Sequence, residues 1–229
     1  AVPFFIMAGN LMNAVGMTDK IFDFATACVG HFRAGLAQVN VLSSMIFAGV
    51  SGAAVADCAG LGTVEIKAMR ERGYPADFAA ALTVASAVIG PIIPPSISLV
   101  IYAFLSNTSV ARLFLAGVIP GILIGCALML FNRAIADKRN FPREPRASLK
   151  EVLRKGVDGI AALVAPGIIL GAIITGFTTA TEAGVLACAY SLLLGVIYRT
   201  INLRRLWQAT TDTMLITSVI MIIVGYSQV

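Results

Sequence analysis

The stretch Gly90-Pro-Ile-Ile-Pro-Pro-Ser96 interrupts a long apolar run over residues 78–105. Each of its three prolines lacks a backbone N–H and clashes with the preceding helical turn, so the run is not one continuous helix. An earlier apolar run, 36–64, is interrupted by small residues and a carboxylate within positions 48–62. Its two halves are each too short to cross a bilayer. We therefore predict a re-entrant hairpin at about 36–64 and a broken helix at about 78–105.

The composition is typical of a protein embedded in a lipid bilayer. Of 229 residues, 58% are hydrophobic and 13% are charged, whereas a soluble domain carries about 25% charge. This excludes an ordinary soluble enzyme and a disordered chain. Blocks such as 113–131 are apolar on every helical face and do not alternate as barrel strands do. The fold class predicted is therefore an all-α polytopic membrane protein.

Other apolar runs predict the remaining spans, and an arm helix is expected within residues 1–132. The short run 21–30 is a candidate interfacial helix. The first run, 2–17, is short for a span, and we expect it to continue upstream in a longer protein of which this chain is an internal fragment. Further spans are expected over about 113–132, 158–177 and 183–198, and a last one begins near Thr210.

Loop charge predicts the orientation of these spans. If the hairpin returns to its own side, the segments 65–77, 133–157 and 199–205 share one face and hold fourteen Lys and Arg, against one on the other face. The basic loop 133–157 is then cytoplasmic. The net charge of +5 therefore reflects the orientation of the chain in the membrane. The sequence has no basic stripe interleaved with aromatics, which nucleic-acid binding would require.

Helix breaks at membrane depth are candidate binding sites, because their free backbone groups must be packed in protein or line a cavity. A half-helix C-terminus offers carbonyls to Na⁺, and a half-helix N-terminus offers N–H groups to a carboxylate. The candidate Na⁺ ligands are Ala48, Ser51, Gly90, Ile93 and Pro95, and the candidate solute contacts are Gly52, Asp57 and Ser96.

Individual residues support these assignments. Ser51 brings a hydroxyl, Ser96 is a candidate N-cap for the following half-helix, and an intramembrane carboxylate such as Asp57 indicates function. Glu182 is expected instead to cap its own helix near Thr178 or Thr179.

Two other interpretations of the hairpin were considered. Its small residues could form only a packing face. Alternatively, Gly49-Val-Ser51-Gly52 matches the G-x-S-G of rhomboid intramembrane serine proteases, but such a serine needs a base, normally a histidine on a later helix. No histidine follows Ser51, because His31 is the only one in the chain, and the enzyme hypothesis is therefore disfavoured.

Five collinear motifs together resemble one transporter family. The chain is similar throughout its length to the large membrane subunit, DctM type, of tripartite ATP-independent periplasmic (TRAP) transporters. The motifs are Phe47-Ala-Gly-Val-Ser-Gly-Ala-Ala-Val-Ala-Asp57, Arg72-Gly-Tyr with Phe78-Ala-Ala-Ala-Leu, Gly90-Pro-Ile-Ile-Pro-Pro-Ser-Ile-Ser98, Leu113-Phe-Leu-Ala-Gly-Val-Ile-Pro-Gly121 and Gly176-Phe-Thr-Thr-Ala-Thr-Glu-Ala183.

The resemblance implies a secondary transporter of the bacterial inner membrane. It implies a carboxylate-bearing solute, a periplasmic solute-binding protein, a small four-helix membrane subunit and a Na⁺ gradient as driving force. It also implies an elevator-type fold with two inverted repeats. Residues 1–132 would then be the first-repeat region, 133–157 the cytoplasmic loop, and 158–229 the start of the second repeat.

The family's first Na⁺ site falls by position on the five residues chosen above as Na⁺ ligands. This chain departs from the family at Ser51-Gly-Ala-Ala54, where Ser-Gly-Ser-Ser is usual, and at Thr179-Ala-Thr-Glu182, where Thr-Pro-Thr-Glu is usual. The alternatives are a stand-alone Na⁺/dicarboxylate carrier and a non-transporting membrane scaffold.

Overall fold

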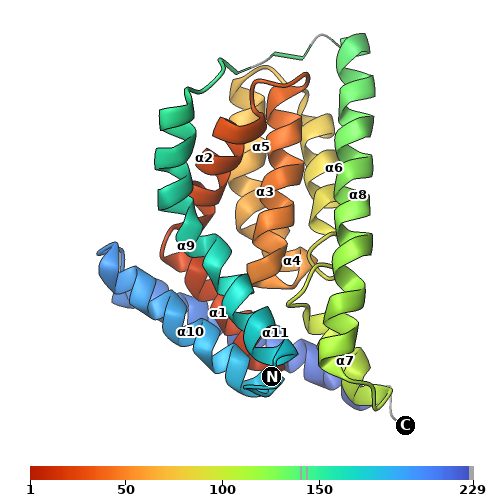
Figure 1. Ribbon diagram of the computed structural model, residues 1–229, viewed down its shortest axis with the longest axis vertical. Coiled ribbons are helices and arrows are strands. Elements are labelled where there is room, and N and C mark those ends of the chain that lie inside the picture. The colour runs from red at the N-terminus through yellow and green to blue at the C-terminus, as the bar shows by residue number, and fades with distance from the viewer. Residues whose placement is uncertain (140, 143, 227–229) are drawn as a thin grey trace.

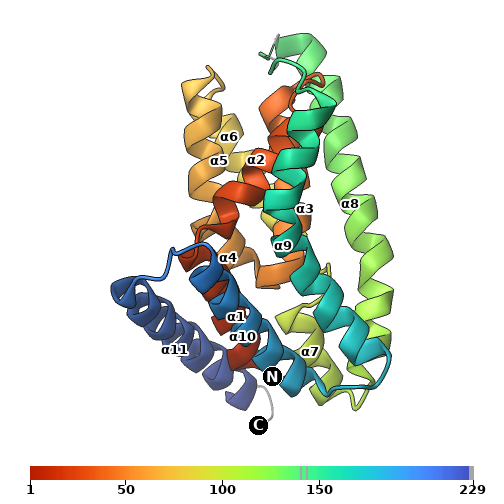
Figure 2. The same cartoon turned by 60° about the vertical axis from the view of Figure 1, so that its left-hand side comes forward.

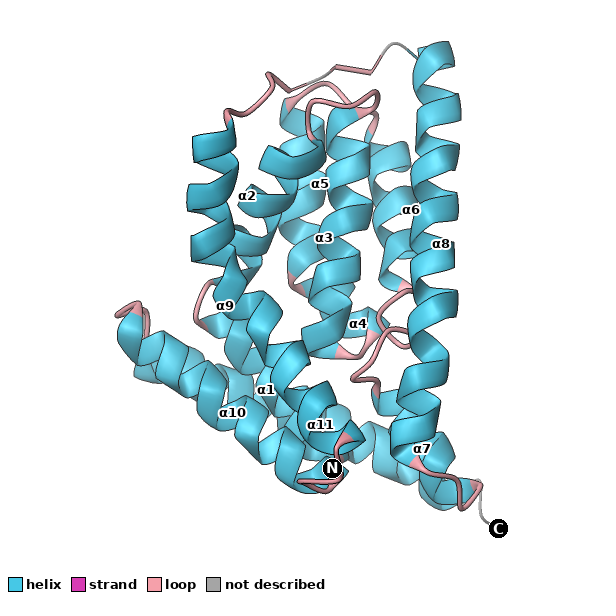
Figure 3. Ribbon diagram, in the orientation of Figure 1, coloured by secondary structure: helices cyan, strands magenta, loops and turns pink. Residues whose placement is uncertain are grey.

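The computed structural model describes residues 1–139, 141–142 and 144–226, and within those ranges every regular element is a helix (Figures 1 and 3). The prediction of an all-α membrane protein is confirmed. Helix α8 (Val110–Arg139), α10 (Ala180–Ile197) and α11 (Leu203–Tyr226) contain stretches long and apolar enough to cross a membrane. The bent helix α9 (Leu149–Ile174) is a fourth if it counts as one span.

The run 36–64 forms a hairpin that returns to the end from which it starts. Helix α3 (Gly35–Ser51) enters the protein, the short helix α4 (Ala54–Ala59) turns, and α5 (Leu61–Glu71) runs back beside α3 (Figure 1). Helix α3 ends because Gly52 adopts a left-handed conformation, φ 60°, in which its N–H donates to the Ala48 carbonyl at 3.1 Å.

The proline cluster breaks the next helix as predicted. Helix α6 (Ala76–Ala87) ends before it and α7 (Ile97–Leu105) begins after it. Ser96 is the N-cap of α7, since its hydroxyl oxygen accepts from the Leu99 N–H at 3.2 Å. Helices α6 and α7 together lead from one end of the molecule to the other, where α8 begins (Figure 1).

The segment 133–157 contains more helix than the sequence suggests. Helix α8 continues through Arg139 and α9 begins at Leu149, so only residues 140–148 separate them. Likewise α11 begins seven residues before Thr210. The reason is physical: charged side chains mark where a helix leaves the bilayer, but they do not end the helix.

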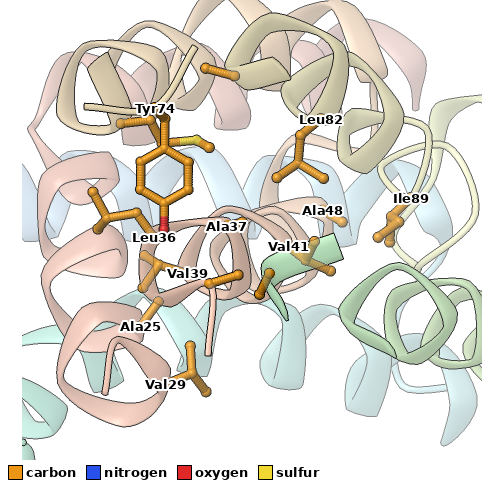
Figure 4. Packing of buried hydrophobic residues seen from close by; sticks show 14 residues of the cluster. Ala25, Val29, Leu36, Ala37, Val39, Val41, Ala48, Tyr74, Leu82 and Ile89 are labelled. Carbon is orange, nitrogen blue, oxygen red and sulfur yellow. The ribbon is translucent and has the colours of Figure 1, made fainter. Parts of the chain in front are cut away.

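The described helices share several apolar cores. The core around α3 includes Val41 of α3 itself, Leu82 of α6 and Ile89 of the break, together with residues of α5 and α8 (Figure 4). The first helix, α1 (Val2–Ala14), packs mainly on α10 and α11 (Figure 2) and also contacts α3 and α7. The run 21–30 lies in α2 (Met17–Val29), which packs against both α3 and α9.

Three glycines of α8 allow it to lie close to the hairpin and the break. Gly117, Gly121 and Gly125 are spaced four residues apart on one face of the helix. A side chain at any of them would collide with the Ile92 carbonyl, the Ile93 side chain or the Met45 side chain, respectively. Small residues at this spacing are typical of close helix packing in membranes.

The segment between α8 and α9 is fastened to the α5–α6 turn and to the end of α2 by contacts that we call the clasp. The Phe141 ring stacks on Tyr74 with centroids 4.5 Å apart, and Glu144 pairs with Arg72 at 2.5 Å. The Glu144 N–H also donates to the Gly30 carbonyl at 3.1 Å. Burial raises the pKa of Tyr74 to about 12, and its hydroxyl donates to the Pro142 carbonyl at 3.2 Å.

The course of α8 predicts the side of the membrane on which the segments before and after it are exposed. In the full-length protein with other cysteines replaced, a Cys at Arg146 (Arg146→Cys) should react with a membrane-impermeant maleimide only from the cytoplasmic side. Ser109→Cys, before α8, should react only from the periplasmic side, because α8 crosses between them. Labelling intact cells and inside-out vesicles tests this. Reaction of both positions from the same side would contradict the topology.

Candidate functional site

The hairpin tip and the helix break meet in the interior. The Ile97 N–H, at the start of α7, donates to the Gly52 carbonyl at 3.3 Å. Gly52 lies so close to the break that a Cβ on it would collide with the Pro95 carbonyl oxygen. Two segments about forty residues apart in sequence therefore share one site, with a half-helix ending at Ser51 and another starting at Ile97.

A buried carboxylate completes this site. Asp57 of α4 is 2% exposed, and its Oδ1 accepts a hydrogen bond from the Ser51 hydroxyl. Its Oδ2 has no hydrogen-bond partner. That oxygen lies against the main chain of Gly90, where a Cβ would meet it at 2.5 Å. A buried carboxylate oxygen without a partner is costly unless a proton or a cation neutralises it.

The other predicted ligands lie around the same junction. The Ala48 carbonyl accepts from the Gly52 N–H, and the Pro95 carbonyl faces Gly52. Ile93 lies on the break, and its side chain packs against Gly121 of α8. The structure thus brings the five predicted Na⁺ residues to one region, where their role as ligands remains a prediction.

A cavity of about 560 Å³ opens beside the tip. It is formed by residues 52–55, the first turns of α7, and the middle of α11. Of the three residues predicted to contact solute, only Gly52 lines it. Asp57 and Ser96 are buried behind the tip and the break. Ala53 and Ala54, where the family usually has serines, form part of its wall.

A network of buried polar side chains, which we call the brace, joins α3, α5 and α6 just above this junction. The Asn40 amide donates to Glu65 at 2.6 Å and to Thr83 at 2.8 Å, and its Oδ1 accepts from Ser86 at 2.8 Å. The Ser43 hydroxyl lies 2.6 Å from the second Glu65 oxygen. The brace thereby fixes both hairpin arms against the broken helix.

The brace is not predicted from the sequence. The loop-charge count treats residues 65–77 as a loop, but α5 continues through Glu71 and Glu65 is only 1% exposed. The signal was present in the spacing: Asn40 and Ser43 are three residues apart, as are Thr83 and Ser86, so each pair shares a helical face. Only the turn at 72–75 separates α5 from α6.

Glu182 has the capping role expected for it. Its carboxylate accepts from the Thr179 N–H at 2.7 Å, while Thr179 Oγ1 accepts from the Glu182 N–H. This is a capping box at the start of α10. His31 lies before the start of α3, at the opposite end of that helix from Ser51. The arrangement therefore gives Ser51 no histidine base, as the protease hypothesis would require.

Comparison with known proteins identifies relatives along the whole chain. Residues 1–229 match the family described as tripartite ATP-independent periplasmic transporter, DctM component. The sialic acid TRAP transporter large permease protein SiaM of Vibrio cholerae is 45% identical, over 98% of this chain and 53% of that protein. The sialic acid TRAP transporter permease protein SiaT of Haemophilus influenzae is 43% identical, over 98% of this chain and 36% of that protein.

A third relative has a different named solute. The 2,3-diketo-L-gulonate TRAP transporter large permease protein YiaN of Escherichia coli is 41% identical over 100% of this chain and 54% of that protein. The chain thus spans about half the length, or less, of these relatives. All three are named as permeases rather than enzymes.

The brace predicts a stability effect. Asn40→Leu should lower the thermal midpoint of the purified full-length protein, because it leaves Glu65, Thr83 and Ser86 without their shared partner. Each buried polar group that loses its partner costs about 1–3 kcal/mol. Gln208→Leu, at an exposed amide on α11, is the matched control and should leave the midpoint unchanged. Equal midpoints for the two variants would contradict the role of the brace.

The contact between the hairpin tip and the helix break predicts that two glycine variants differ in thermal stability. Gly52→Ala introduces both a left-handed alanine and a clash with the Pro95 carbonyl, whereas Gly16→Ala introduces only the left-handed alanine, because nothing lies within 4 Å of it. The strain common to both is about 1–2 kcal/mol. Gly52→Ala should therefore lower the thermal midpoint more than Gly16→Ala. Equal losses would show that the tip is not closely packed on the break.

Proposed function

The chain belongs to the DctM component family of tripartite ATP-independent periplasmic transporters, and we propose that the protein carrying it performs Na⁺-coupled uptake of a carboxylate-bearing solute. The protein is a permease of the bacterial inner membrane. The observation that carries the Na⁺ assignment is the buried Asp57 Oδ2, which lies without a hydrogen-bond partner where the hairpin tip meets the break.

The chemistry of this junction suits Na⁺. The residues that would hold the ion are the five named from the sequence, together with the Asp57 carboxylate. They supply main-chain carbonyls, one hydroxyl and one carboxylate, all of which are hard oxygen donors. In the described ranges no group of three or more His, Cys, Asp and Glu side chains could hold a transition metal. Binding of Na⁺ would fix the tip against the break.

Binding of Na⁺ would also assemble the solute site. We expect a carboxylate to bind at the 560 Å³ cavity, near the N-terminus of α7, where the helix dipole favours an anion. The relatives' names include sialic acid, 2,3-diketo-L-gulonate and C4-dicarboxylate, which are organic acids. The Ala53–Ala54 wall would contact the solute through apolar atoms rather than hydroxyls.

Coupling to Na⁺ gives the transport its direction. Moving one elementary charge across 100 mV yields about 2.3 kcal/mol. Two or more Na⁺ ions carried with one monoanion would therefore drive uptake against a solute gradient. As in other TRAP systems, the partners proposed are a small four-helix membrane subunit and a periplasmic solute-binding protein that delivers the solute.

Uptake into proteoliposomes tests the coupling. The full-length protein, its small subunit and its binding protein should accumulate solute with external Na⁺, and replacing Na⁺ by choline should abolish accumulation because the driving ion is lost. Omitting the binding protein should also abolish it. Uptake of free solute without the binding protein would support the stand-alone carrier instead, and uptake that never saturates would support a channel-like scaffold.

Two substitutions test the site itself. Asp57→Asn removes the charge and Ser51→Leu removes the hydroxyl, so each should raise the Na⁺ concentration for half-maximal uptake at least tenfold. This corresponds to the roughly 1.5–3 kcal/mol that a contact with a charged group contributes. Glu182→Gln, at an exposed carboxylate far from the tip, is the control. Wild-type Na⁺ dependence in both site variants would refute the assignment.

A further inference from the structure

The brace contains a carboxyl group whose two oxygens both contact uncharged side chains. Glu65 of α5 is 1% exposed. Its Oε1 lies 2.6 Å from the Ser43 hydroxyl oxygen, and its Oε2 lies 2.6 Å from the Asn40 amide. Helices α3, α4 and α6, which pack against α5, contain no lysine, arginine or histidine. The helices that enclose Glu65 therefore offer it no base.

The other charges on and around α5 do not compensate Glu65. From α4, Asp57 and Cys58 lie close enough to interact with it electrostatically, and neither group is positively charged in any protonation state. Lys20 of α2 lies over the Tyr198 ring of α10, 2.9 Å from its centroid. The remaining charged residues of α2, α5 and α6 are exposed at the surface, and they are Asp19, Asp23, Lys67, Arg70, Glu71 and Asp77. An ionised Glu65 would be a buried charge without a counter-charge, which is costly.

The distances in the brace are those of a carboxylic acid that donates a proton. O–H···O hydrogen bonds are commonly about 2.7 Å long, whereas N–H···O bonds are commonly about 2.9 Å long. At 2.6 Å, the contact between Glu65 Oε2 and the Asn40 amide is short for an N–H donor and suits an O–H donor. The proton is then on Glu65, and the Asn40 amide presents its oxygen. A half-turn of the amide is enough for this, because it exchanges the positions of the oxygen and the nitrogen.

The hydroxyl groups around Asn40 support this orientation. The Ser86 hydroxyl has one hydrogen, yet it lies 2.8 Å from the Asn40 amide and 3.1 Å from the Thr83 carbonyl. If Asn40 presents its nitrogen to Ser86, that nitrogen donates to Ser86 Oγ, and the single Ser86 hydrogen serves the Thr83 carbonyl. The Thr83 hydroxyl, 2.8 Å from the Asn40 amide, then donates to the amide oxygen. Each of these hydroxyl hydrogens has one acceptor in this arrangement.

We propose that Glu65 is a neutral carboxylic acid in the folded protein and that the brace holds its proton between Glu65 Oε2 and the Asn40 oxygen. Glu65 takes this proton from water as the chain folds. Ser43 donates to the other carboxyl oxygen, so both oxygens are hydrogen-bonded without any charge. The protonation of Glu65 does not depend on Na⁺ coupling.

The consequence for ion binding rests on the proposed function. Asp57 and Glu65 are the buried acidic residues of the hairpin, since Glu71 is exposed. With Glu65 neutral, the hairpin carries one buried negative charge, at Asp57, and one Na⁺ neutralises it. With Glu65 ionised, two cations would be needed. The brace thereby limits the junction of tip and break to a single Na⁺.

Infrared spectroscopy of the full-length protein in lipid nanodiscs measures this protonation state, because a carboxylic acid and a carboxylate absorb at separate C=O stretching frequencies. At neutral pH the wild type should show an acid band that Glu65→Gln lacks, since glutamine has the shape of the neutral acid but no carboxyl group. Isotopic labelling of glutamate carboxyl carbons should shift the same band in the wild type, which tests the assignment even if the variant does not fold. Glu71→Gln, at an exposed carboxylate of the same helix, is the matched control and should keep the band.

Identical acid absorption in the wild type and Glu65→Gln, or a band that labelling does not shift, would overturn the proposal. Binding of radioactive Na⁺ tests the consequence, because the wild type and Glu65→Gln should bind the same number of ions per protein. One ion fewer in Glu65→Gln would show that Glu65 is charged and needs its own cation. An intact Glu65 band in a protein that binds no Na⁺ would instead reject the Na⁺ assignment and leave the protonation of Glu65 standing.

Discussion

A backbone hydrogen bond from the Ile97 N–H to the Gly52 carbonyl joins the hairpin tip to the broken helix. In hydrocarbon there is no water to satisfy backbone groups freed by a helix break. Here each break is placed against the other, and the left-handed conformation of Gly52 together with its missing side chain makes the approach to Pro95 feasible. Contacts elsewhere in the protein keep the hairpin tip and the broken helix in this close contact.

Two sets of contacts hold the hairpin tip against the broken helix from different sides. The brace fixes α3, α5 and α6 through side-chain hydrogen bonds, and the α8 glycines admit Ile92, Ile93 and Met45 from the other side. The hairpin, the broken helix and α8 consequently form one packed unit, and α1 connects α10 and α11 to it through contacts with α3 and α7. The 560 Å³ cavity lies where α11 meets the hairpin tip and α7.

Much of this architecture was predictable because prolines and glycines have strong local effects. The proline cluster and Gly52 locate both breaks, and the cap at Ser96 and the capping box at Glu182 follow from short-range rules. Helix ends near charged residues were predicted less well, since the bilayer boundary and the helix end differ at Arg139. Glu65 was missed because its burial depends on α3 and α6 packing around it, which no local pattern records.

The clasp shortens the free connection between α8 and α9. The nine residues 140–148 alone would reach about 30 Å when extended. Glu144, however, is fixed to Arg72 and Gly30, so only five peptide units, about 17 Å, lead from it to Leu149. Any larger separation of Leu149 from Glu144 would first require Glu144 to detach from Arg72 and Gly30.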